Sequence, residues 1–460
     1  MTRFRLPGRV KAIAGILRDG GFQCYLVGGA VRNLVMGSAP KDYDLATDAL
    51  PEEVRKLFHR VIPTGIEHGT VTVLFKGEQF EVTTFRSETA YSDGRHPDAV
   101  RFEQEIHADL SRRDFTMNGM AVDVHSGELY DPFDGRGDIR RGLVRAIGEP
   151  QERLREDGLR IMRALRFAAQ LGFRIEEETF TALQGEVEAL RPVAEERIRE
   201  ELVRMLEAAV PSEGLRPMYD CGAMRLVLPE LADCPGTPQE GGTVADLLEH
   251  LLLTCDAVVP ARSELRLAAL LHDIGKPDTM EEGPEGVISF HGHAERSAEL
   301  SEGILTRLRF PTRTIRYVRR LISAHMIHYQ QEWSDAAVRR FVHRVGPDAV
   351  WDLIALQRAD LQGKRQESRS RKRRPGLEEL EDRVREILDA ESALSLRDLA
   401  VNGRDLQAEA SIPAGPALGQ VLDFLLETVL DDPGQNNRER LLEIARNFYE
   451  ERLKPGSGER

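Results

Sequence analysis

The sequence predicts an α+β fold in which a part with a small sheet comes first and an all-α region follows. Up to about residue 145, short apolar runs of strand character alternate with helical segments. From about residue 150 the chain is rich in helix-forming residues and stays so to its end. A chain of 460 residues has room for about three or more domains, each able to bury a core.

Composition and charge are those of an ordinary soluble protein. Hydrophobic residues make up 41% and charged residues 30%, and no apolar run approaches the ~18 residues that a membrane-spanning helix needs. The four cysteines are scattered without a C-x-x-C motif, which favours the reducing cytoplasm. Residues 1–22 form an amphipathic segment without the apolar core of a signal peptide. With a net charge of −14, any binding of nucleic acid must depend on local basic patches.

Residues 25–48 contain the clearest chemical pattern in the chain. A short apolar strand at 25–27 leads into Gly28 and Gly29, and the helix that starts there carries Arg32. Glycines at such a turn let backbone N–H groups come close to a phosphate, and the start of a helix favours negative charge. The pattern therefore indicates a phosphate-binding turn, with a buried structural turn as the alternative.

Two aspartates follow after a Gly/Pro break. We expect Asp42 and Asp44 on a second strand, where residues i and i+2 point to the same face. Paired carboxylates beside an anion site repel each other unless cations bridge them, and Mg²⁺ suits such oxygen ligands. Two Mg²⁺ ions could activate an attacking hydroxyl and neutralise a leaving pyrophosphate. Glu81, on a later strand, could add a third carboxylate; a solvated role is the alternative for all three.

The remaining elements of the first part follow from local patterns. We expect a helix at 51–58, strands at 71–75 and 80–85 joined by a Lys76-Gly77 turn, and a polar loop at 88–97.

A basic pair, Arg112 and Arg113, follows this loop. It offers positive charge to a triphosphate, and Asp114 could orient both side chains. An exposed basic pair at the start of a helix is the alternative.

Residues 152–171 are expected to form one helix with a charged face made of Glu156, Asp157, Arg160, Arg163 and Arg166. Spacings of three and four residues would bring Glu156, Asp157 and Arg160 together. One interpretation is a surface ion pair worth about 0.3–0.5 kcal/mol. The other is a base-reading edge, because a carboxylate accepts from an exocyclic amine while a guanidinium donates to the adjacent ring nitrogen. Cytosine and adenine fit that edge, whereas guanine and uracil would set a carbonyl against the carboxylate.

Taken in order, these segments resemble a known family. The motifs LVGGAVR, DYDLAT, GIEHGTVTV, TTFRSETAYSDGRHPDAVRF, RRDFTMNGMA, DPFDGRGDI, REDGLRIMRALRF and ERIREELVRML are similar to those of class II tRNA nucleotidyltransferases, the bacterial CCA-adding enzymes, over about residues 20–210. The resemblance implies a mixed-sheet, polymerase-beta-like head that adds CMP and AMP to the 3′ end of tRNA, with CTP and ATP as substrates. Asn33 departs from the family, which usually has Asp there, so the orientation of Arg32 by a salt bridge is in doubt.

Residue roles follow from the resemblance. Asp42 and Asp44 would be the catalytic metal ligands, and Gly28, Gly29, Arg32 and Arg113 would contact the nucleotide. Asp157, Arg160, Arg163 and Arg166 would form the protein template, with Glu156 beside them. In this family a flexible loop is associated with addition of the terminal A, and Tyr91, Asp93 and Arg95 lie in the corresponding stretch. Whether the chain adds CCA entire or only the last A stays open.

A second ligand set lies in the middle of the chain. Histidines and aspartates on several expected helices resemble the metal ligands of the HD superfamily: His250, His272, Asp273, His293, His325 and Asp360. Mixed imidazole and carboxylate ligands suit a transition metal better than Mg²⁺. Phosphohydrolase action on 2′,3′-cyclic or 3′-phosphate ends is one expectation, and buried core histidines are the alternative.

We therefore expect four domains: a nucleotidyltransferase head at 1–149, a helical neck for nucleobase recognition at 150–228, an HD metal-binding domain at 229–374 and a helical tRNA-binding tail at 375–460. The basic stretch 364–374 would contact phosphates or simply be solvated.

Three other functions compete with CCA addition. A bacterial poly(A) polymerase shares the head, a phosphohydrolase could use the head as an RNA-binding scaffold, and an RNA chaperone would need no catalysis.

Overall fold

The computed structural model describes residues 3–66, 69–89, 99–238, 246–284, 287–327, 329–365, 375–390 and 395–454. The chain divides into two compact units. The first contains Met1–Asp233 and Ile304–Phe310, and the second contains Cys234–Gly303 and Pro311–Arg460. The expected division into four domains is finer than this and stays a prediction.

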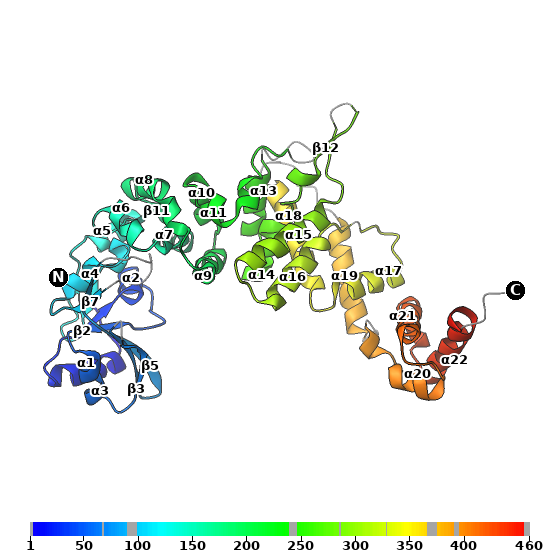
Figure 1. Cartoon of the computed structure of the whole chain (residues 1–460), viewed down its shortest axis with the longest axis horizontal. Helices are drawn as coiled ribbons and strands as arrows, with labels where there is room; N and C mark the ends of the chain where they lie inside the picture. Colours follow the sequence, from blue (N-terminus) through cyan, green and yellow to red (C-terminus); the bar gives the residue numbers. More distant parts are fainter. Residues whose placement is uncertain are drawn as a thin grey trace. The chain divides into compact units, whose positions relative to one another are not determined.

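The first unit begins with a seven-stranded mixed sheet, so the predicted α+β class is confirmed (Figure 1). In spatial order its strands are β3 (Val61–Gly65), β4 (Thr70–Phe75), β5 (Glu78–Thr84), β2 (Leu45–Thr47), β1 (Tyr25–Val27), β8 (Ala121–Asp123) and β9 (Leu129–Tyr130). Neighbours pair antiparallel except β2 and β5, which are parallel with Leu45 opposite Val82. The central strands are buried on both faces, which explains their apolar runs.

Helices cover this sheet. The apolar face of α1 (Gly8–Asp19) contributes Val10, Ile13 and Leu17 to a core that also contains Leu26 and Leu45. The head is completed by α2 (Gly29–Val35), α3 (Pro51–Leu57), a hairpin of β6 (Arg86–Thr89) and β7 (Ala99–Phe102), α4 (Ile106–Ser111), η2 (Thr116–Asn118), α5 (Gly135–Arg141) and β10 (Leu143–Val144).

The rest of the first unit is almost entirely helical. Its elements are α6 (Pro150–Glu156), α7 (Leu159–Leu171), β11 (Arg174–Ile175), α8 (Glu177–Gly185), η3 (Val187–Leu190), α9 (Glu195–Leu206), α10 (Ser212–Asp220), α11 (Ala223–Val227) and α12 (Pro229–Ala232). The last turn of α15 is also counted with this unit.

The expected single helix at 152–171 is wrong, because the chain breaks between α6 and α7. Asp157 is extended, with φ −146° and ψ 105°. At Gly158 an added Cβ would lie 1.8 Å from the carbonyl oxygen of Ala189, so the backbone of η3 approaches too closely for any side chain. This packing, which local periodicity does not reveal, separates the two helices.

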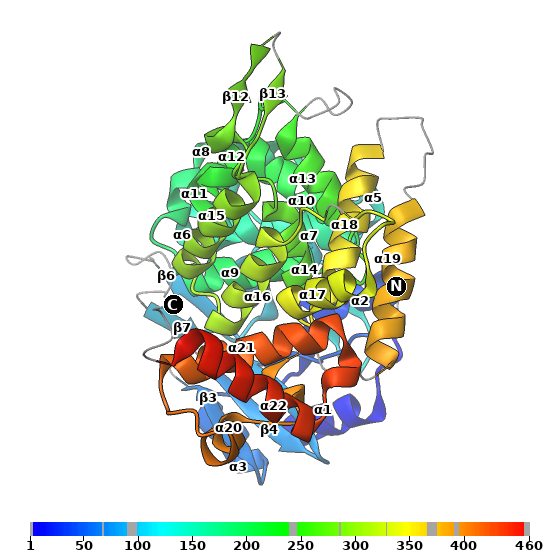
Figure 2. The ribbon, with the colours of Figure 1, turned by 90° about the vertical axis from the view of Figure 1, so that its right-hand side faces the viewer.

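The second unit is a helical assembly with one small ribbon, β12 (Glu281–Glu282) and β13 (Ile288–Ser289), which extends away from its helices in both views (Figure 1 and Figure 2). Its helices are α13 (Leu247–Asp256), α14 (Ser263–Leu271), η4 (Pro277–Thr279), α15 (His293–Arg307), α16 (Thr312–Ser323), α17 (Asp335–Val345), α18 (Val350–Arg365), α19 (Pro375–Asp389), η6 (Leu396–Asp398), α20 (Gly403–Glu409), α21 (Pro416–Asp431), η7 (Pro433–Gln435), α22 (Arg438–Phe448) and the π-helical turn η8 (Tyr449–Leu453). Helix α14 packs against α13, α16 and α18.

Candidate functional site

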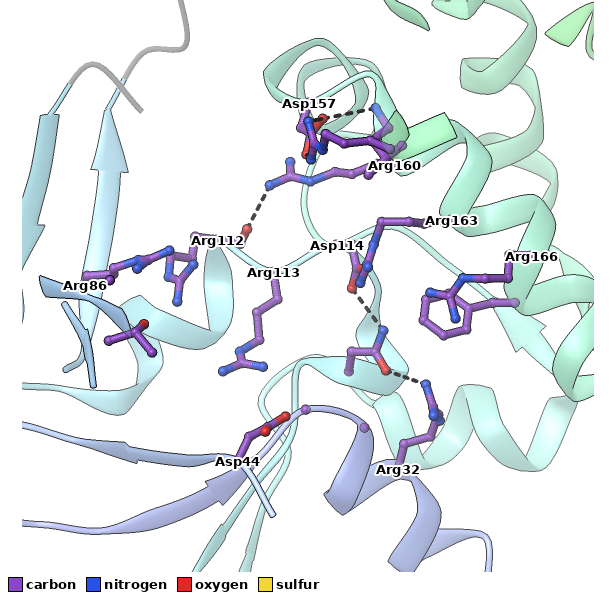
Figure 3. A pocket seen from close by; sticks show the side chains of 18 of the residues that line it. Arg32, Asp44, Arg86, Arg112, Arg113, Asp114, Asp157, Arg160, Arg163 and Arg166 are labelled. Atoms are coloured by element: carbon purple, nitrogen blue, oxygen red, sulfur yellow. Dashed lines mark hydrogen bonds and ion pairs between the residues drawn. The ribbon is translucent and has the colours of Figure 1, made fainter. Parts of the chain in front are cut away.

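The turn after β1 places its glycines against charged groups. Gly28 has φ +68°, and a Cβ there would lie 3.1 Å from Nη1 of Arg113 and 3.8 Å from Oδ2 of Asp44. A glycine at this position therefore accepts the left-handed backbone and leaves room for both side chains. Figure 3 shows Asp44 and Arg113 facing each other across this turn.

The two predicted aspartates lie before a strand rather than on one. Asp42 is in an exposed bend after Pro40, and β2 begins only where the apolar residue Leu45 is buried. The expected strand placement is therefore wrong, because pairing starts where burial starts. One backbone bond still extends the ladder, since the N–H of Val27 donates to the carbonyl of Asp44 at 3.0 Å. Asp44 is thus held beside the glycine turn.

Three carboxylates interact around Asp44. Partial removal from water raises the pKa of Asp44, and the charges of Glu81 and Asp42 raise it further against the opposing charge of Arg113. The register of β2 on β5 explains the effect of Glu81, because Leu45 pairs with the next residue, Val82. These neighbouring carboxylates concentrate negative charge on oxygen atoms, which are suitable ligands for a divalent cation.

Arg112 and Arg113 follow the end of α4, and Asp109 orients them. The carboxylate of Asp109 is fully buried and accepts from Arg112 at 2.8 Å and from Arg113 at 3.1 Å. Their charges and hydrogen bonds outweigh the effect of burial and lower the pKa of Asp109. The expectation that Asp114 orients this pair is wrong: Asp109 is one helical turn earlier on the same side, whereas Asp114 faces α7.

Asp114 instead joins the head to α7 through a buried network. It accepts from Nε of Arg163 at 2.8 Å and from the amide of Asn118 at 3.0 Å, and the Asn118 oxygen accepts from Arg32 at 3.0 Å (Figure 3). Burial alone would raise the pKa of Asp114, but Arg163 and Asn118 outweigh it and lower the pKa to about 2. Arg32 also donates to the Asn33 oxygen at 3.1 Å, so Asn33 orients it without a salt bridge.

Asp157 and Arg160 lie on either side of the break between α6 and α7, and their side chains have different partners. Asp157 accepts from Arg197 of α9 at 2.8 Å and from the N–H of Leu159 at 3.0 Å. The side chain of Arg160 is buried, pairs with Glu156, and donates to the carbonyl of Arg112 at 3.1 Å. The expected pairing of Glu156 with Arg160 is present, whereas the partner of Asp157 is Arg197.

Further along α7, three guanidinium groups surround one aromatic ring. Arg166 pairs with Glu201 and lies 3.9 Å from the centre of the Phe167 ring, and Arg32 and Arg163 lie 5.2 and 5.5 Å from it. Desolvation and the neighbouring arginines lower the pKa values of Arg32 and Arg166 despite nearby carboxylates. This concentration of positive charge favours an anionic ligand.

These groups line one cavity of about 730 Å³. Its lining includes most of the predicted nucleotide-site residues: Gly28, Gly29, Arg32, Asp44, Arg113, Asp157, Arg160, Arg163 and Arg166. Asp42 and Glu156 are not among the lining residues. Eight arginines and three aspartates line the cavity, so it suits a polyanion such as a nucleoside triphosphate.

Some lining residues were not predicted as site residues. Arg86 and Arg197 add positive charge to the cavity wall beside the predicted pair Arg112 and Arg113, and Asn118 links Asp114 to Arg32. Arg197 lies in the motif ERIREELVRML, but nothing local indicates that it reaches Asp157. Tyr91, Asp93 and Arg95 lie outside the described residues.

The second predicted ligand set converges within the second unit. Oδ1 of Asp273 lies 3.3 Å from Nε2 of both His293 and His325, and its Oδ2 lies 3.4 Å from Nε2 of His272. Asp360 reaches His250 at 3.2 Å and His272 at 3.6 Å. Two groups of three have ligand atoms within 4.8 Å of one another: His250, His272 and Asp273; and Asp273, His293 and His325.

The histidines are oriented for metal binding. Nδ1 of His272, His293 and His325 bonds to a backbone carbonyl at 2.7–2.8 Å, so Nε2 points into the cluster. Such second hydrogen bonds are typical of metal-ligating histidines. Buried ligand atoms of the cluster, including Nε2 of His272 and Oδ1 of Asp273, have no hydrogen-bond partner. The donor set thus fits a metal ion.

The comparisons with known proteins agree with this architecture. The family model "Poly A polymerase head domain" matches residues 24–145, "Probable RNA and SrmB- binding site of polymerase A" matches 172–234, and the model of tRNA nucleotidyltransferase domain 2 matches 289–445. The CCA-adding enzyme of Ligilactobacillus salivarius is 31% identical over 451 residues, which cover 97% of this chain and 99% of the relative. The chain belongs to the CCA-adding enzyme family.

Other members of the CCA-adding enzyme family are similar over most of their length. The enzyme of Enterococcus faecalis is 31% identical over 448 residues, covering 96% of this chain and 97% of the relative. The crystal structure of the Bacillus stearothermophilus CCA-adding enzyme in complex with CTP has a TM-score of 0.73 at 28% identity, covering 96% of this chain and 98% of the other. A Thermotoga maritima CCA-adding enzyme complexed with tRNA, at 20% identity and a TM-score of 0.59, shares the fold over 97% of this chain and 100% of the other.

Family membership agrees with the chemistry of the head. Nucleotidyl transfer in this family implies a divalent metal, typically Mg²⁺, and the carboxylates around Asp44 are suitable ligands. Within the described part of the chain, no helix combines the length and the hydrophobicity that crossing a membrane requires.

Proposed function

We propose that this protein adds CMP and AMP to the 3′ end of tRNA, using CTP and ATP and releasing pyrophosphate. One observation carries the proposal: Asp44, the glycine turn, eight arginines and the Asp157–Arg160 segment line the same cavity. A triphosphate and its base can therefore be held together. Membership of the CCA-adding enzyme family supports the choice of tRNA as acceptor.

The head residues would perform the transfer. The ribose 3′-hydroxyl attacks the α-phosphate, and the bond to the leaving pyrophosphate breaks. Asp42 and Asp44, with Glu81 beside them, would hold two Mg²⁺ ions; when bound, such ions lower the pKa of the attacking hydroxyl and neutralise the leaving group. Arg113, held by Asp109 beside Gly28, supplies fixed positive charge to the triphosphate. Its guanidinium needs no reorganisation during the reaction.

The segment at the α6–α7 break would select the base. The Asp157 carboxylate can accept from the exocyclic amine of cytosine or adenine, and Arg160 can donate to the adjacent ring nitrogen. Arg197 holds Asp157, and Glu156 holds Arg160, so the edge is oriented before the nucleotide arrives. Guanine and uracil would each place a carbonyl oxygen against the carboxylate, a mismatch that discriminates strongly.

Each of the four predicted domains would have its own role in the reaction. The head (1–149) carries the catalytic carboxylates, and the neck (150–228) carries the template. The central domain (229–374) holds the second ligand set, and the tail (375–460) would contact the outer part of the tRNA, positioning it through phosphates.

A single set of reactions tests the function. tRNA ending at the discriminator base, at C or at CC is incubated with CTP and ATP, and the products are sequenced. Completion of CCA from all three shows full CCA addition, whereas extension of only the CC-ending tRNA shows addition of the terminal A. Long A-only products on any RNA would instead identify a poly(A) polymerase, and no extension would refute the proposal.

The converging ligand set supports a second function, hydrolysis of a phosphoester at a transition-metal site. Buried ligand atoms of His250, His272 and Asp273 have no hydrogen-bond partner, which a purely structural core does not need. Substrates to test are RNAs that end in a 2′,3′-cyclic or a 3′-phosphate. The protein with full nucleotide-adding activity, loaded with Mn²⁺, Ni²⁺ or Co²⁺, should release the phosphate or open the ring. Failure on both substrates with every metal would contradict this second function.

A further inference from the structure

We propose that a basic cleft between the start of α14 and one face of α16 binds the phosphate backbone of RNA. The cleft has a volume of about 510 Å³, and four arginines line it: Arg262, Arg313, Arg316 and Arg320. It lies in the second unit and shares no residue with the arginine-lined cavity of the first. The inference rests on the proposed function in one respect, the choice of tRNA as the RNA.

Glu264 and Asp348 also line the cleft, but two of its four guanidinium groups make no ion pair among the described residues. Arg262 pairs with Asp352, and Arg320 pairs with Asp348 at 2.8 Å. Arg313 and Arg316 are exposed, and within the described residues neither makes a hydrogen bond or an ion pair. In a chain with a net charge of −14, two free arginines in a cleft form a local site for anions.

The spacing of these residues suits a chain of phosphates rather than one small anion. Arg313, Arg316 and Arg320 are three and four residues apart, so they share one face of α16. Their Cα atoms rise by about 4.5 and 6 Å along the helix axis. Arginine side chains bind phosphate oxygens bidentately. A row of arginines can therefore contact successive phosphates of a nucleic acid without recognising its sequence.

The cleft is distinct from the candidate metal centre. Helix α14 begins after Arg262 and ends next to His272, and α16 begins before Arg313 and leads to His325. The two helices pack together, so Arg262, Arg313 and Arg316 lie at the opposite end of the pair from the histidines, while Arg320 lies in the last turn of α16. Separations of nine to twelve residues along the helices put these three arginines roughly 14–18 Å from the histidines. The N-terminal helix ends on the arginine side add partial positive charge.

The test compares the double variant Arg313→Ala/Arg316→Ala with the control Arg319→Ala. Arg319 is on the same helix but is already paired, with Glu295 at 3.4 Å and Glu302 at 3.3 Å. The dissociation constant for tRNA is measured by filter binding at several salt concentrations. We expect the double variant to bind about tenfold more weakly, with the slope of log K against log salt reduced by about 1.5. The control should match the wild type, and the KM for CTP should not change in either variant.

The outcomes separate this inference from the proposed function. If the wild type adds nucleotides but the double variant keeps the wild-type affinity and salt slope, the cleft does not bind RNA and the inference is overturned. If the wild type adds no nucleotides, the proposed function fails, and the change in RNA affinity still decides the inference. Unchanged tRNA binding together with lost binding of polyglutamate would assign the cleft to an acidic protein and overturn it. Circular dichroism checks that the variants are folded.

Discussion

The break between α6 and α7 predicts an unusual effect of Gly158→Ala. The backbone at Gly158 is right-handed, with φ −56° and ψ −23°, so alanine suits it conformationally. In such positions Gly→Ala normally stabilises a protein by about 0.4–1 kcal/mol. Here the added Cβ would lie 1.8 Å from the Ala189 oxygen. The expected effect therefore has the opposite sign.

The magnitude follows from the overlap. Ordinary contact begins near 3.4 Å, so η3 and the start of α7 must move apart by about 1.5 Å, and overpacking of this kind costs about 1–3 kcal/mol. After the normal gain is subtracted, we expect a loss of about 1–2 kcal/mol. For a unit of this size, such a loss lowers the Tm by roughly 2–8 °C. Because Asp157 precedes the displaced residue, nucleotide discrimination should also fall.

The assay is thermal unfolding together with incorporation of each nucleotide in competition. The control is Gly15→Ala, within α1 of the same unit, where an added Cβ meets no atom within 4 Å. It should raise stability by about 0.5–1 kcal/mol. A Gly158→Ala protein as stable as the wild type, with unchanged nucleotide preference, would refute the close packing that separates α6 from α7.

Three other predictions concern single contacts. Arg197→Met removes the partner of Asp157 and should raise misincorporation of UMP and GMP about tenfold, while the KM for the triphosphates changes less; an equal change in both would count against a base-orienting role. Because the pKa of Asp114 is lowered to about 2, its ionised form contributes about 2 kcal/mol to stability at neutral pH. This contribution is lost as the pH falls from about 4 toward 2. The difference in urea midpoint between wild type and Asp114→Asn should therefore shrink in that range, and a constant difference would contradict the prediction. His325→Ala should lower the bound transition metal, measured by elemental analysis, and leave nucleotide addition intact; loss of both would show that the two sites depend on each other.

Local patterns predicted the parts of the fold that local forces determine. The strands at 71–75 and 80–85 and the turn at Lys76-Gly77 appear as expected because alternation, β-branching and a left-handed turn are properties of adjacent residues. The glycine turn after 25–27 was predictable for the same reason. Each of these elements needs no information from distant parts of the chain.

The errors have a common physical cause in contacts between distant residues. Helical periodicity continues through Gly158, whereas the structure breaks at the extended Asp157, next to the point where η3 packs against Gly158. The rule of three- and four-residue spacings suggested Arg160 as the partner of Asp157, but Arg197, forty residues away, occupies that place. Asp109 likewise replaces Asp114 as the partner of the basic pair.

The metal ligands illustrate the opposite case. His250 and Asp360 are far apart in the sequence, and no periodicity connects them. They were predicted only because their motifs resemble a known superfamily, and the packing of α13 against α18 brings them to 3.2 Å.

The central claim is that one cavity both transfers the nucleotide and chooses its base. The most direct measurement supplies tRNA with equal CTP, ATP, GTP and UTP and sequences the products made by Asp44→Asn and Arg160→Ala. We predict that Asp44→Asn loses addition of every nucleotide by a factor of at least about 100, whereas Arg160→Ala still adds nucleotides but includes UMP and GMP. An active Asp44→Asn enzyme, or an Arg160→Ala enzyme that is slower but equally selective, would contradict the claim.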